Sequence, residues 1–166
     1  MASTDLTAER LRELLHYDLA TGVFTRIARR NSNAKIGDQA GSLRADGYHI
    51  IRLDNKIYRT HRLAWLYVHS RWPDKEIDHV NGKRTDNWIA NLREATRSEN
   101  QQNLRHQTSR STSGFLGVSW HKARMKWIAQ IKIDGQKHYL GYFSIASEAH
   151  AAYIEAKRMY HPFAFS

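Results

Sequence analysis

The chain has 166 residues and a formal net charge of +10 at pH 7, with an isoelectric point of about 10.0. This excess of positive charge predicts an acidic partner, nucleic acid first and an anionic membrane surface second. The sequence has no cysteine, which excludes disulfides and thiolate zinc sites. Because it also lacks a signal-peptide pattern and any apolar run near the ~20 residues that span a bilayer, we expect an intracellular protein with no membrane partner.

The first part of the chain predicts a helix followed by basic strands and loops. Residues 4–17 carry the leucine stripe of a short helix capped by Thr7. Residues 23–25 begin a strand, and residues 26–37 are basic and form a loop. Residues 41–59 alternate around an Asp-Asn turn, which predicts a hairpin with a basic face. The arginines that we expect to contact nucleic acid from this hairpin are Arg44, Arg52 and Arg59.

The stretch 77–103 is the centre of the sequence. It follows a helix predicted at 61–70 and joins an Asp-His pair at 78–79 to five asparagines. An Asn-Gly turn signal at 81–82 predicts a short hairpin after the pair. A capping box formed by Thr96 and Glu99 then predicts a helix from residue 97. On that helix Asn100 and Asn103 share one face.

These residue types suit phosphodiester hydrolysis. The reaction needs a nucleophilic water and a hard cation with oxygen ligands to neutralise charge on the phosphate and the leaving oxygen. Asp78 offers a carboxylate and Asn100 an amide carbonyl, while His79 points to the opposite face of the strand and suits a general base. Asn91 either orients that imidazole or ties the loop. The alternative, in which the pair is a capped turn and the asparagines are turn formers, explains each residue but not their coincidence.

The stretch resembles the HNH nuclease motif of phage and group I intron homing endonucleases. Asp78-His79, Asn91 and Asn100 match its order of Asp-His, Asn, and His or Asn, and the preceding segment YRTHRLAWLYVHS is also similar. The resemblance implies that His79 is the general base, that Asp78 and Asn100 are metal ligands, and that Asn91 is a structural or orienting residue. It implies one divalent cation, Mg²⁺ with Mn²⁺ as the alternative. Because the third position is Asn rather than His, Asn103 and His106 remain alternative ligands.

The C-terminal part reads as a second module. We expect domains at 1–104 and 114–162, joined by a polar and basic linker at 105–113. In the second domain three strands lead into a helix capped by Ser147 and ending near residue 160, with an Asp-Gly hairpin turn at 134–135. Residues 104–166 carry a net charge of +6, against +4 for the longer part before them, as expected of a module that binds a polyanion.

The segment contains the pattern GV-W…KW-A-I…G…LG-F…EA--AY, which resembles the Apetala-type DNA-binding domain of plant ethylene-response factors, a domain that also accompanies phage HNH enzymes. That family lays a three-stranded sheet in the major groove. A strand alternates its side chains between two faces, so only one of the tryptophans at 120 and 127 is expected to contact DNA, the other being a packing residue. The residues that the resemblance assigns to DNA contact are Trp120, Lys122, Arg124, Lys126, Lys132 and Lys137.

The sequence therefore predicts an α+β protein with two parts. An N-terminal ββα-metal (HNH, His-Me finger) nuclease domain precedes a small three-stranded antiparallel sheet packed on one helix. The predicted function is metal-dependent, site-specific cleavage of double-stranded DNA by an enzyme of the homing type, encoded by a phage and acting in the cytoplasm of a bacterial host. Nicking or double-strand cleavage, and a monomer or a homodimer, remain open. The alternative function is a non-catalytic, sequence-specific DNA-binding regulator; RNA binding is a weaker alternative.

Overall fold

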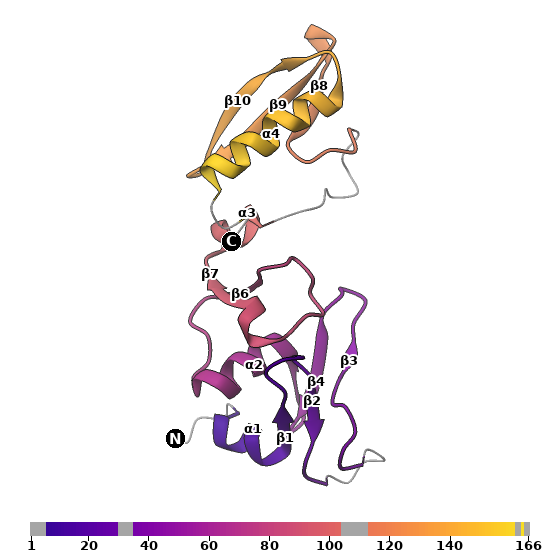
Figure 1. Ribbon diagram of the computed structural model, residues 1–166, viewed down its shortest axis with the longest axis vertical. Helices are drawn as coiled ribbons and strands as arrows, with labels where there is room; N and C mark the ends of the chain where they lie inside the picture. The colour runs from indigo at the N-terminus through magenta and orange to yellow at the C-terminus, as the bar shows by residue number, and fades with distance from the viewer. Residues whose placement is uncertain (1–5, 30–34, 104–112, 162–163, 165–166) are drawn as a thin grey trace. The chain divides into compact units, whose positions relative to one another are not determined.

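The computed structural model describes residues 6–29, 35–103, 113–161 and 164 (Figure 1). The chain forms two compact units, Met1–Thr96 and Arg97–Ser166, which are described separately below. Both contain helices and antiparallel strands, so the predicted α+β class is confirmed. Of the predicted linker at 105–113, residues 105–112 lie outside the described ranges, as does His106, and the predicted domain boundaries stay a prediction. No helix within the described ranges is long and apolar enough to cross a membrane.

The first unit combines two α-helices with three small antiparallel sheets. The sheets have the strand orders β1-β2, β3-β4-β5 and β6-β7. The helices are α1 (Ala8–Leu14), α2 (Thr60–His69) and the 3₁₀ helix η1 (Ile89–Asn91). The strands are β1 (Leu15–Tyr17), β2 (Phe24–Arg26), β3 (Ser42–Leu43), β4 (His49–Leu53), β5 (Lys56–Arg59), β6 (Glu76–His79) and β7 (Leu92–Ala95).

The helix predicted over 4–17 is shorter than expected. Its cap is confirmed, since the Thr7 side chain accepts a hydrogen bond from the Arg10 amide at 3.2 Å. The prediction of helix up to residue 17 is wrong, because the chain turns extended at Leu15 and pairs with β2 as β1. Burial then alternates, and the Tyr17 ring packs on Phe24 with centroids 4.7 Å apart. Tertiary pairing of a few residues has overridden the leucine periodicity.

The two predicted hairpin turns have different outcomes. Asp54 and Asn55 both adopt positive φ, as the tight turn between β4 and β5 requires, so that hairpin is confirmed. The prediction that the Asn-Gly pair at 81–82 closes a short hairpin is wrong. Gly82 completes a turn in which its own amide donates to the His79 carbonyl at 2.8 Å. The strand that pairs with β6 is β7, which follows the connection 80–91. The Asn-Gly pair does form a turn, but the strand that pairs with β6 lies farther along the chain than a two-residue hairpin would place it.

The core of the first unit lies between α1, α2 and the strands. Its most deeply buried large apolar side chains are Leu11, Leu15, Phe24, Ile51, Leu53, Leu63 and Leu66. Along β4 the buried Ile51 and Leu53 alternate with the exposed Arg52, so one face of the sheet joins the core and the other carries charge. The basic face predicted for this hairpin therefore has a structural cause.

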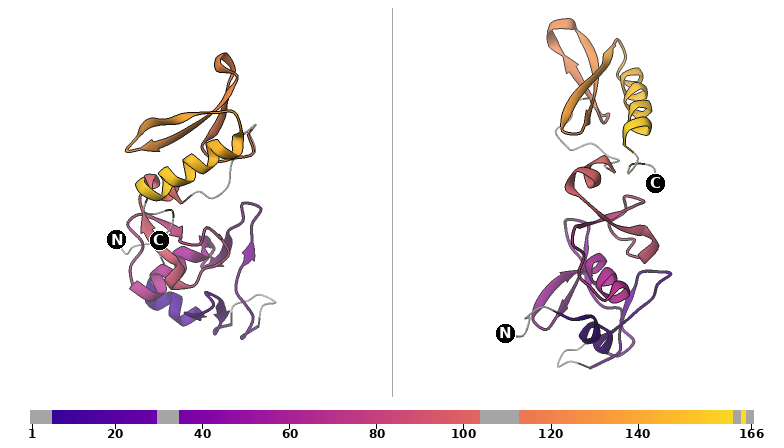
Figure 2. Two further views of the ribbon diagram at one scale, coloured as in Figure 1. Left: turned by 45° about the horizontal axis from the view of Figure 1, so that its top comes forward. Right: turned by 90° about the vertical axis from the view of Figure 1, so that its left-hand side faces the viewer.

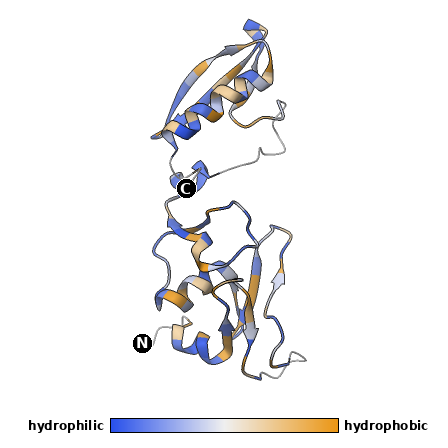
Figure 3. Cartoon of the chain, in the orientation of Figure 1, coloured by the Kyte–Doolittle hydropathy of each residue, from blue (hydrophilic) through white to orange (hydrophobic). Residues whose placement is uncertain are grey.

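The second unit is a three-stranded antiparallel sheet with one long helix and a short one. The strand order is β10-β9-β8, and the right-hand view of Figure 2 shows α4 running along one face of the sheet. The short helix α3 is hydrophilic throughout (Figure 3). The elements are α3 (Arg97–Gln102), β8 (Val118–His121), the 3₁₀ helix η2 (Lys122–Arg124), β9 (Lys126–Ile133), β10 (Gln136–Phe143) and α4 (Ala146–Tyr160).

Small residues allow α4 to pack closely on the sheet. Ala149, Tyr153 and Ala156 are buried on its inner face. Gly117 adopts positive φ, and a Cβ there would lie 2.0 Å from the Tyr153 ring, so no other residue fits at this close approach. The predicted cap at Ser147 is wrong: the helix begins at Ala146, one residue before it, and its cap position offers no side-chain oxygen.

We predict that Glu94 makes the first unit sensitive to acid. Its carboxylate bonds Arg71 at 2.9 Å and the Asp74 amide at 2.6 Å, and the Arg71 bond chiefly lowers the pKa of Glu94 from 4.5 to about 2. A lowered carboxylate pKa stabilises the fold above the unfolded value, and this stability is lost as pH falls from 4.5 towards 2. Glu94→Gln should therefore lower the melting temperature at pH 6 and match the parent near pH 2.

Arg71→Met provides the matched control for this prediction. It removes the partner that chiefly lowers the Glu94 pKa, so it should abolish most of the same pH dependence, and the double variant should lose less stability than the sum of the two single variants. Parallel melting curves for parent and Glu94→Gln across this pH range would contradict the assignment.

Candidate active site

Asp78 lies on β6 directly opposite Arg93 on β7. This register places both side chains on one face of the two-stranded sheet, where Nε and Nη2 of Arg93 donate to Oδ2 of Asp78 at 3.0 and 2.9 Å. The Asp78 side chain is buried and the Arg93 side chain is mostly buried. Two converging bonds to one oxygen fix the orientation of the carboxylate. Arg93 had no predicted role, because its partner follows from the strand register.

His79 follows Asp78 and is also buried, with its ring nitrogen Nε2 3.2 Å from Oδ1 of Asn87. The Asn87 amide donates from Nδ2 to the Thr85 carbonyl at 3.0 Å, which leaves Oδ1 as the acceptor. On this assignment Nε2 carries the proton and the lone pair of the imidazole lies on Nδ1. Burial lowers the pKa of His79, so the ring is neutral near pH 7. Asn87 was one of several asparagines in the stretch, and nothing in their spacing singled it out.

Asn91 closes the connection between β6 and β7. Its side chain accepts from the Asn81 amide at 2.9 Å and donates to Oδ1 of Asn81 at 3.1 Å and to the Asp86 carbonyl at 2.7 Å. Its own carbonyl accepts from the Val80 amide at 2.8 Å. These bonds correspond to the loop-tying alternative for Asn91, and the hydrogen bond to the imidazole comes from Asn87 instead.

Two aromatic rings back His79. The His61 ring, from the first turn of α2, meets the His79 ring edge to face with centroids 5.1 Å apart. The Tyr48 ring lies 5.3 Å from the His61 ring and 6.2 Å from the His79 ring. Burial, and then the neighbouring His79, lower the pKa of His61 to about 3. A neutral His61 therefore packs against His79 without adding charge.

The predicted arginine contacts fall in two places on the first unit. Arg59 and Arg44 approach the Asp46 carboxylate, at 3.9 and 3.8 Å. Arg52 lines a shallow hollow of about 340 Å³ together with Arg26. The structure thus brings Arg44 and Arg59 together and places Arg52 at a separate hollow.

The remaining predicted metal ligand, Asn100, is a half-buried residue of α3, which belongs to the second unit. Its role towards a metal stays a prediction. Asn103, the alternative ligand, is buried just after α3. Within the described ranges no three side chains of His, Cys, Asp or Glu gather where they could hold a metal ion. A cation bound by these residues would thus rely on amide oxygens or water to complete its shell.

The sheet of the second unit has one face covered by α4 and one open face. Lys132 on β9 and Lys137 on β10 are cross-strand partners on the open face, which Lys126 shares. Arg124 from η2 reaches the same face and lies 4.6 Å from the centre of the Tyr142 ring. Lys122 is exposed in the same η2 turn. Like charges opposite each other weaken a sheet, so this face favours an anionic partner.

Trp120 lies away from this open face. Its register pairs it with Trp127, and alternation along β8 puts it on the side of the buried Val118, which α4 covers. It keeps 38% exposure and packs edge to face on Trp127 at 5.0 Å. The open face instead presents Tyr139 and Tyr142, which the sequence had not singled out.

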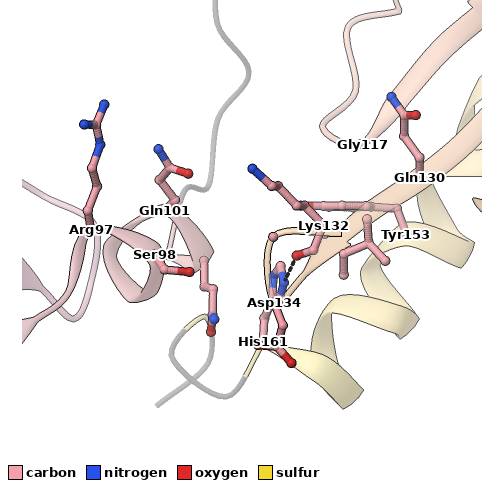
Figure 4. A pocket seen from close by; sticks show the side chains of 12 residues that line it. Arg97, Ser98, Gln101, Gly117, Gln130, Lys132, Asp134, Tyr153 and His161 are labelled. Atoms are coloured by element: carbon pink, nitrogen blue, oxygen red, sulfur yellow. Dashed lines mark hydrogen bonds between the residues drawn. The ribbon is translucent and has the colours of Figure 1, made fainter. Parts of the chain in front are cut away.

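A cavity of about 530 Å³ also lies in the second unit (Figure 4). Arg97 and Lys132 line it together with Asp134, so it mixes both signs of charge. The His161 ring closes one side and lies 2.9 Å from the Lys132 carbonyl through Nε2. No sequence motif had pointed to this cavity, and the residues predicted for catalysis do not line it.

The neutral, buried His61 predicts a loss of stability on acidification. Because its folded pKa of about 3 lies below the ordinary 6.5, the unfolded chain binds the extra proton first, and the fold weakens as pH falls from 6.5 towards 3. The slope is at most about 1.4 kcal/mol per pH unit. His61→Phe keeps a ring against His79 and should flatten this dependence in urea unfolding at pH 7 and pH 4. An unchanged slope would show that His61 does not titrate on unfolding.

Comparison with known proteins places this site in a family. The sequence model described as HNH endonuclease matches residues 58–102, which contain α2, β6, β7 and α3. Over 84 residues the chain is 37% identical to Protein 3.8 of Escherichia phage T7, covering 50% of this chain and 69% of that protein.

A solved structure, titled "DNA binding and cleavage by the HNH homing endonuclease I-HmuI", is 25% identical, with a TM-score of 0.43, and is matched over 76% of this chain and 71% of its own. Asp78, His79 and Asn91, with the bonds described above, lie inside the segment matched by the family model. The chain therefore carries an HNH endonuclease domain.

Proposed function

We propose that the protein is a metal-dependent DNA endonuclease whose general base is His79. The observation that carries this proposal is the buried His79 imidazole, bonded through Nε2 to Asn87, next to the buried Asp78 carboxylate on β6. The HNH endonuclease domain supports the same activity. A neutral imidazole with its lone pair on Nδ1 can accept a proton from the water that attacks phosphorus. The phosphorus–oxygen bond on the far side then breaks, the departing alkoxide takes a proton from a solvent water, and the imidazolium returns its proton to solvent.

The residues around His79 keep it ready for this role. Asn87 fixes the tautomer, and the His61 ring limits rotation of the imidazole through its edge-to-face contact. Burial holds the pKa of His79 below its ordinary value, so the base is unprotonated at neutral pH. The bonds of Asn91 keep the connection 80–91 closed around the ring.

The donors fit a hard cation. Asp78 supplies a carboxylate that Arg93 orients, and Asn100 supplies an amide oxygen, both of which suit Mg²⁺ or Mn²⁺. When bound, the cation neutralises charge on the phosphate and the departing oxygen. Asn103 is the second candidate for the amide ligand, because it follows the same short helix and the sequence spacing alone does not separate the two.

We assign the second unit to DNA binding, as an Apetala-type module that holds the duplex for the nuclease. The support is its open face, where Lys126, Lys132 and Lys137 stand beside exposed tyrosines. Arginine and lysine bind backbone phosphates, while Tyr139 and Tyr142 can pack against sugars and bases. Trp120 is not part of this assignment, since alternation puts it on the covered side.

The finer class of the enzyme is the homing type, acting on one duplex site. One active site cuts one strand in each binding event, so a monomer nicks the duplex. A double-strand cut needs a homodimer or a second binding event. A regulator that binds DNA without cutting it is the alternative function. The open basic face would serve either protein, whereas the buried imidazole held by Asn87 favours the enzyme.

The first prediction from this proposal uses supercoiled plasmid. The protein should relax it with Mg²⁺ and not with a chelator. His79→Ala should lose at least about 10²-fold in single-turnover rate, the usual contribution of a general base, and keep its affinity for DNA. Asp78→Asn should lose cleavage while keeping the side-chain shape. Binding by the parent without relaxation under any divalent cation would favour the regulator instead.

The second prediction concerns the open face. In a chelator, Lys132→Gln and Lys137→Gln should each weaken duplex binding and reduce its salt dependence by about one counterion. Arg158→Gln removes the same charge from the last turn of α4, on the other side of the sheet, and should leave the slope unchanged. An equal effect of all three variants would mean that the open face does not hold DNA.

A further inference from the structure

Tyr48 is where the basic hairpin meets the catalytic histidine. It follows the Gly47 turn before β4 and is half-buried. One side of its environment consists of the two imidazoles, His61 and His79, with ring centroids 5.3 and 6.2 Å away. No step of the proposed mechanism uses Tyr48, so its position next to the base calls for another explanation.

Two guanidinium groups rest on the same Tyr48 ring. The central carbon of the Arg59 guanidinium lies 4.3 Å from the ring centre, and that of Arg84 lies 4.8 Å away. Arg59 ends β5, and Arg84 belongs to the connection 80–91 that follows His79. Cation–π contact holds a guanidinium flat against a ring and leaves its N–H groups directed outward in a fixed plane. The two arginines are therefore preorganised although they come from distant parts of the chain.

The charge of this group is not balanced. Asp46 faces Arg44 at 3.8 Å and Arg59 at 3.9 Å, while Arg84 bonds the Asp46 main-chain carbonyl at 2.8 Å. Arg44 and Arg59 thus share one carboxylate, and Arg84 bonds only a neutral carbonyl, so the three arginines and Asp46 together carry two net positive charges. The Arg59 and Asp46 side chains are 51% and 38% exposed, so their ion pair contributes little stability. An anion that accepts two hydrogen bonds from the Arg59 guanidinium can therefore replace the Asp46 carboxylate as its partner.

We propose that Arg59 and Arg84, held on the Tyr48 ring, form a seat for one backbone phosphate of the DNA next to the bond that is cut. The inference rests on the proposed nuclease function and adds substrate-contacting residues to it. Arginine forks match the geometry of a phosphate, and a seat on a ring that also contacts His79 holds a phosphate close to the one attacked. Tyr48 is the positioning residue, because its ring contacts the two arginines and His79 but not the DNA.

The seat supplies orientation as well as affinity. A phosphate fixed beside the base limits how the neighbouring phosphate can lie against His79, and small misplacements at this distance reduce the rate strongly. Arg59 was expected to bind DNA from the sequence, but Arg84 and Tyr48 were not. In sequence Arg84 reads as one charge in a turn, and only the fold brings it to the ring.

The test is ethylation interference with the full chain in a chelator, so that no strand is cut. Duplexes that carry randomly ethylated, and therefore neutral, phosphates are separated into bound and free fractions by gel retardation. The parent should show a position where ethylation blocks binding next to the bond that it cuts once Mg²⁺ is added. Arg59→Gln and Arg84→Gln should bind about tenfold more weakly, a typical loss for a bond to a charged group, and should no longer sense that position.

Matched variants separate contact from folding. Arg10→Gln removes an exposed arginine of α1 and should keep the parent interference pattern. Tyr48→Phe keeps the ring and should behave as the parent, whereas Tyr48→Leu should lose the same position as the arginine variants. Arginine variants that retain the full pattern, or that lose a position far from the cut, would overturn the seat. If the parent cuts nothing, the proposed function fails, while the interference pattern still decides whether these arginines hold a phosphate.

Discussion

The antiparallel pairing of β6 with β7 is the constraint on which the site depends. It sets Asp78 opposite Arg93 and His79 opposite Leu92, so the two motif residues, adjacent in sequence, project to opposite faces. Pairing also forces residues 80–91 to leave and return at one end of the sheet. The Asn91 side chain bonds two main-chain groups of this connection, the Asn81 amide and the Asp86 carbonyl, and also the Asn81 side chain. A register slip of one residue would exchange the faces of Asp78 and His79.

Burial then determines what the histidines can do. A protonated imidazole is poorly solvated in a tight interior, so the pKa values of His61 and His79 both fall and the two rings can touch without repulsion. The Tyr48 ring packs beside the two imidazoles and also contacts the guanidinium groups of Arg59 and Arg84. Neutral rings inside and guanidiniums outside give a site with an unprotonated base next to a surface that attracts phosphate.

In the second unit, side chains alternate between the two faces of the sheet, so one face forms the core and the other is open to a partner. Ala129 and Ile131 face α4 and form the core, while Gln130 and Lys132 point the other way. The buried Ala149 and the close approach at Gly117 let α4 lie close against one face of the sheet. Because one face is occupied by the helix, the other stays open for a partner, and its cross-strand lysines make an anion the favourable one.

The sequence by itself determined the features that depend on neighbouring residues. Thr7 capped its helix, the Asp-Asn and Asp-Gly turns adopted the positive φ that their side chains tolerate, and the α+β class followed from alternation. The spacing of Asp78, His79 and Asn91 identified the candidate site, because the motif occupies one short stretch. For the same reason the turns of the β4-β5 and β9-β10 hairpins could be predicted and the longer return from β6 to β7 could not.

Only the tertiary structure decided which residues far apart in the sequence contact each other. The end of α1 at Leu14 was set by pairing with β2, and the covered side of Trp120 by the register of β8 with β9. Asn87, Arg93 and Arg84 received their partners from the same long-range arrangement. Hydrogen bonds, ion pairs and ring contacts act over a few ångströms in space whatever the separation in sequence, so a single sequence names the residues without showing which of them meet.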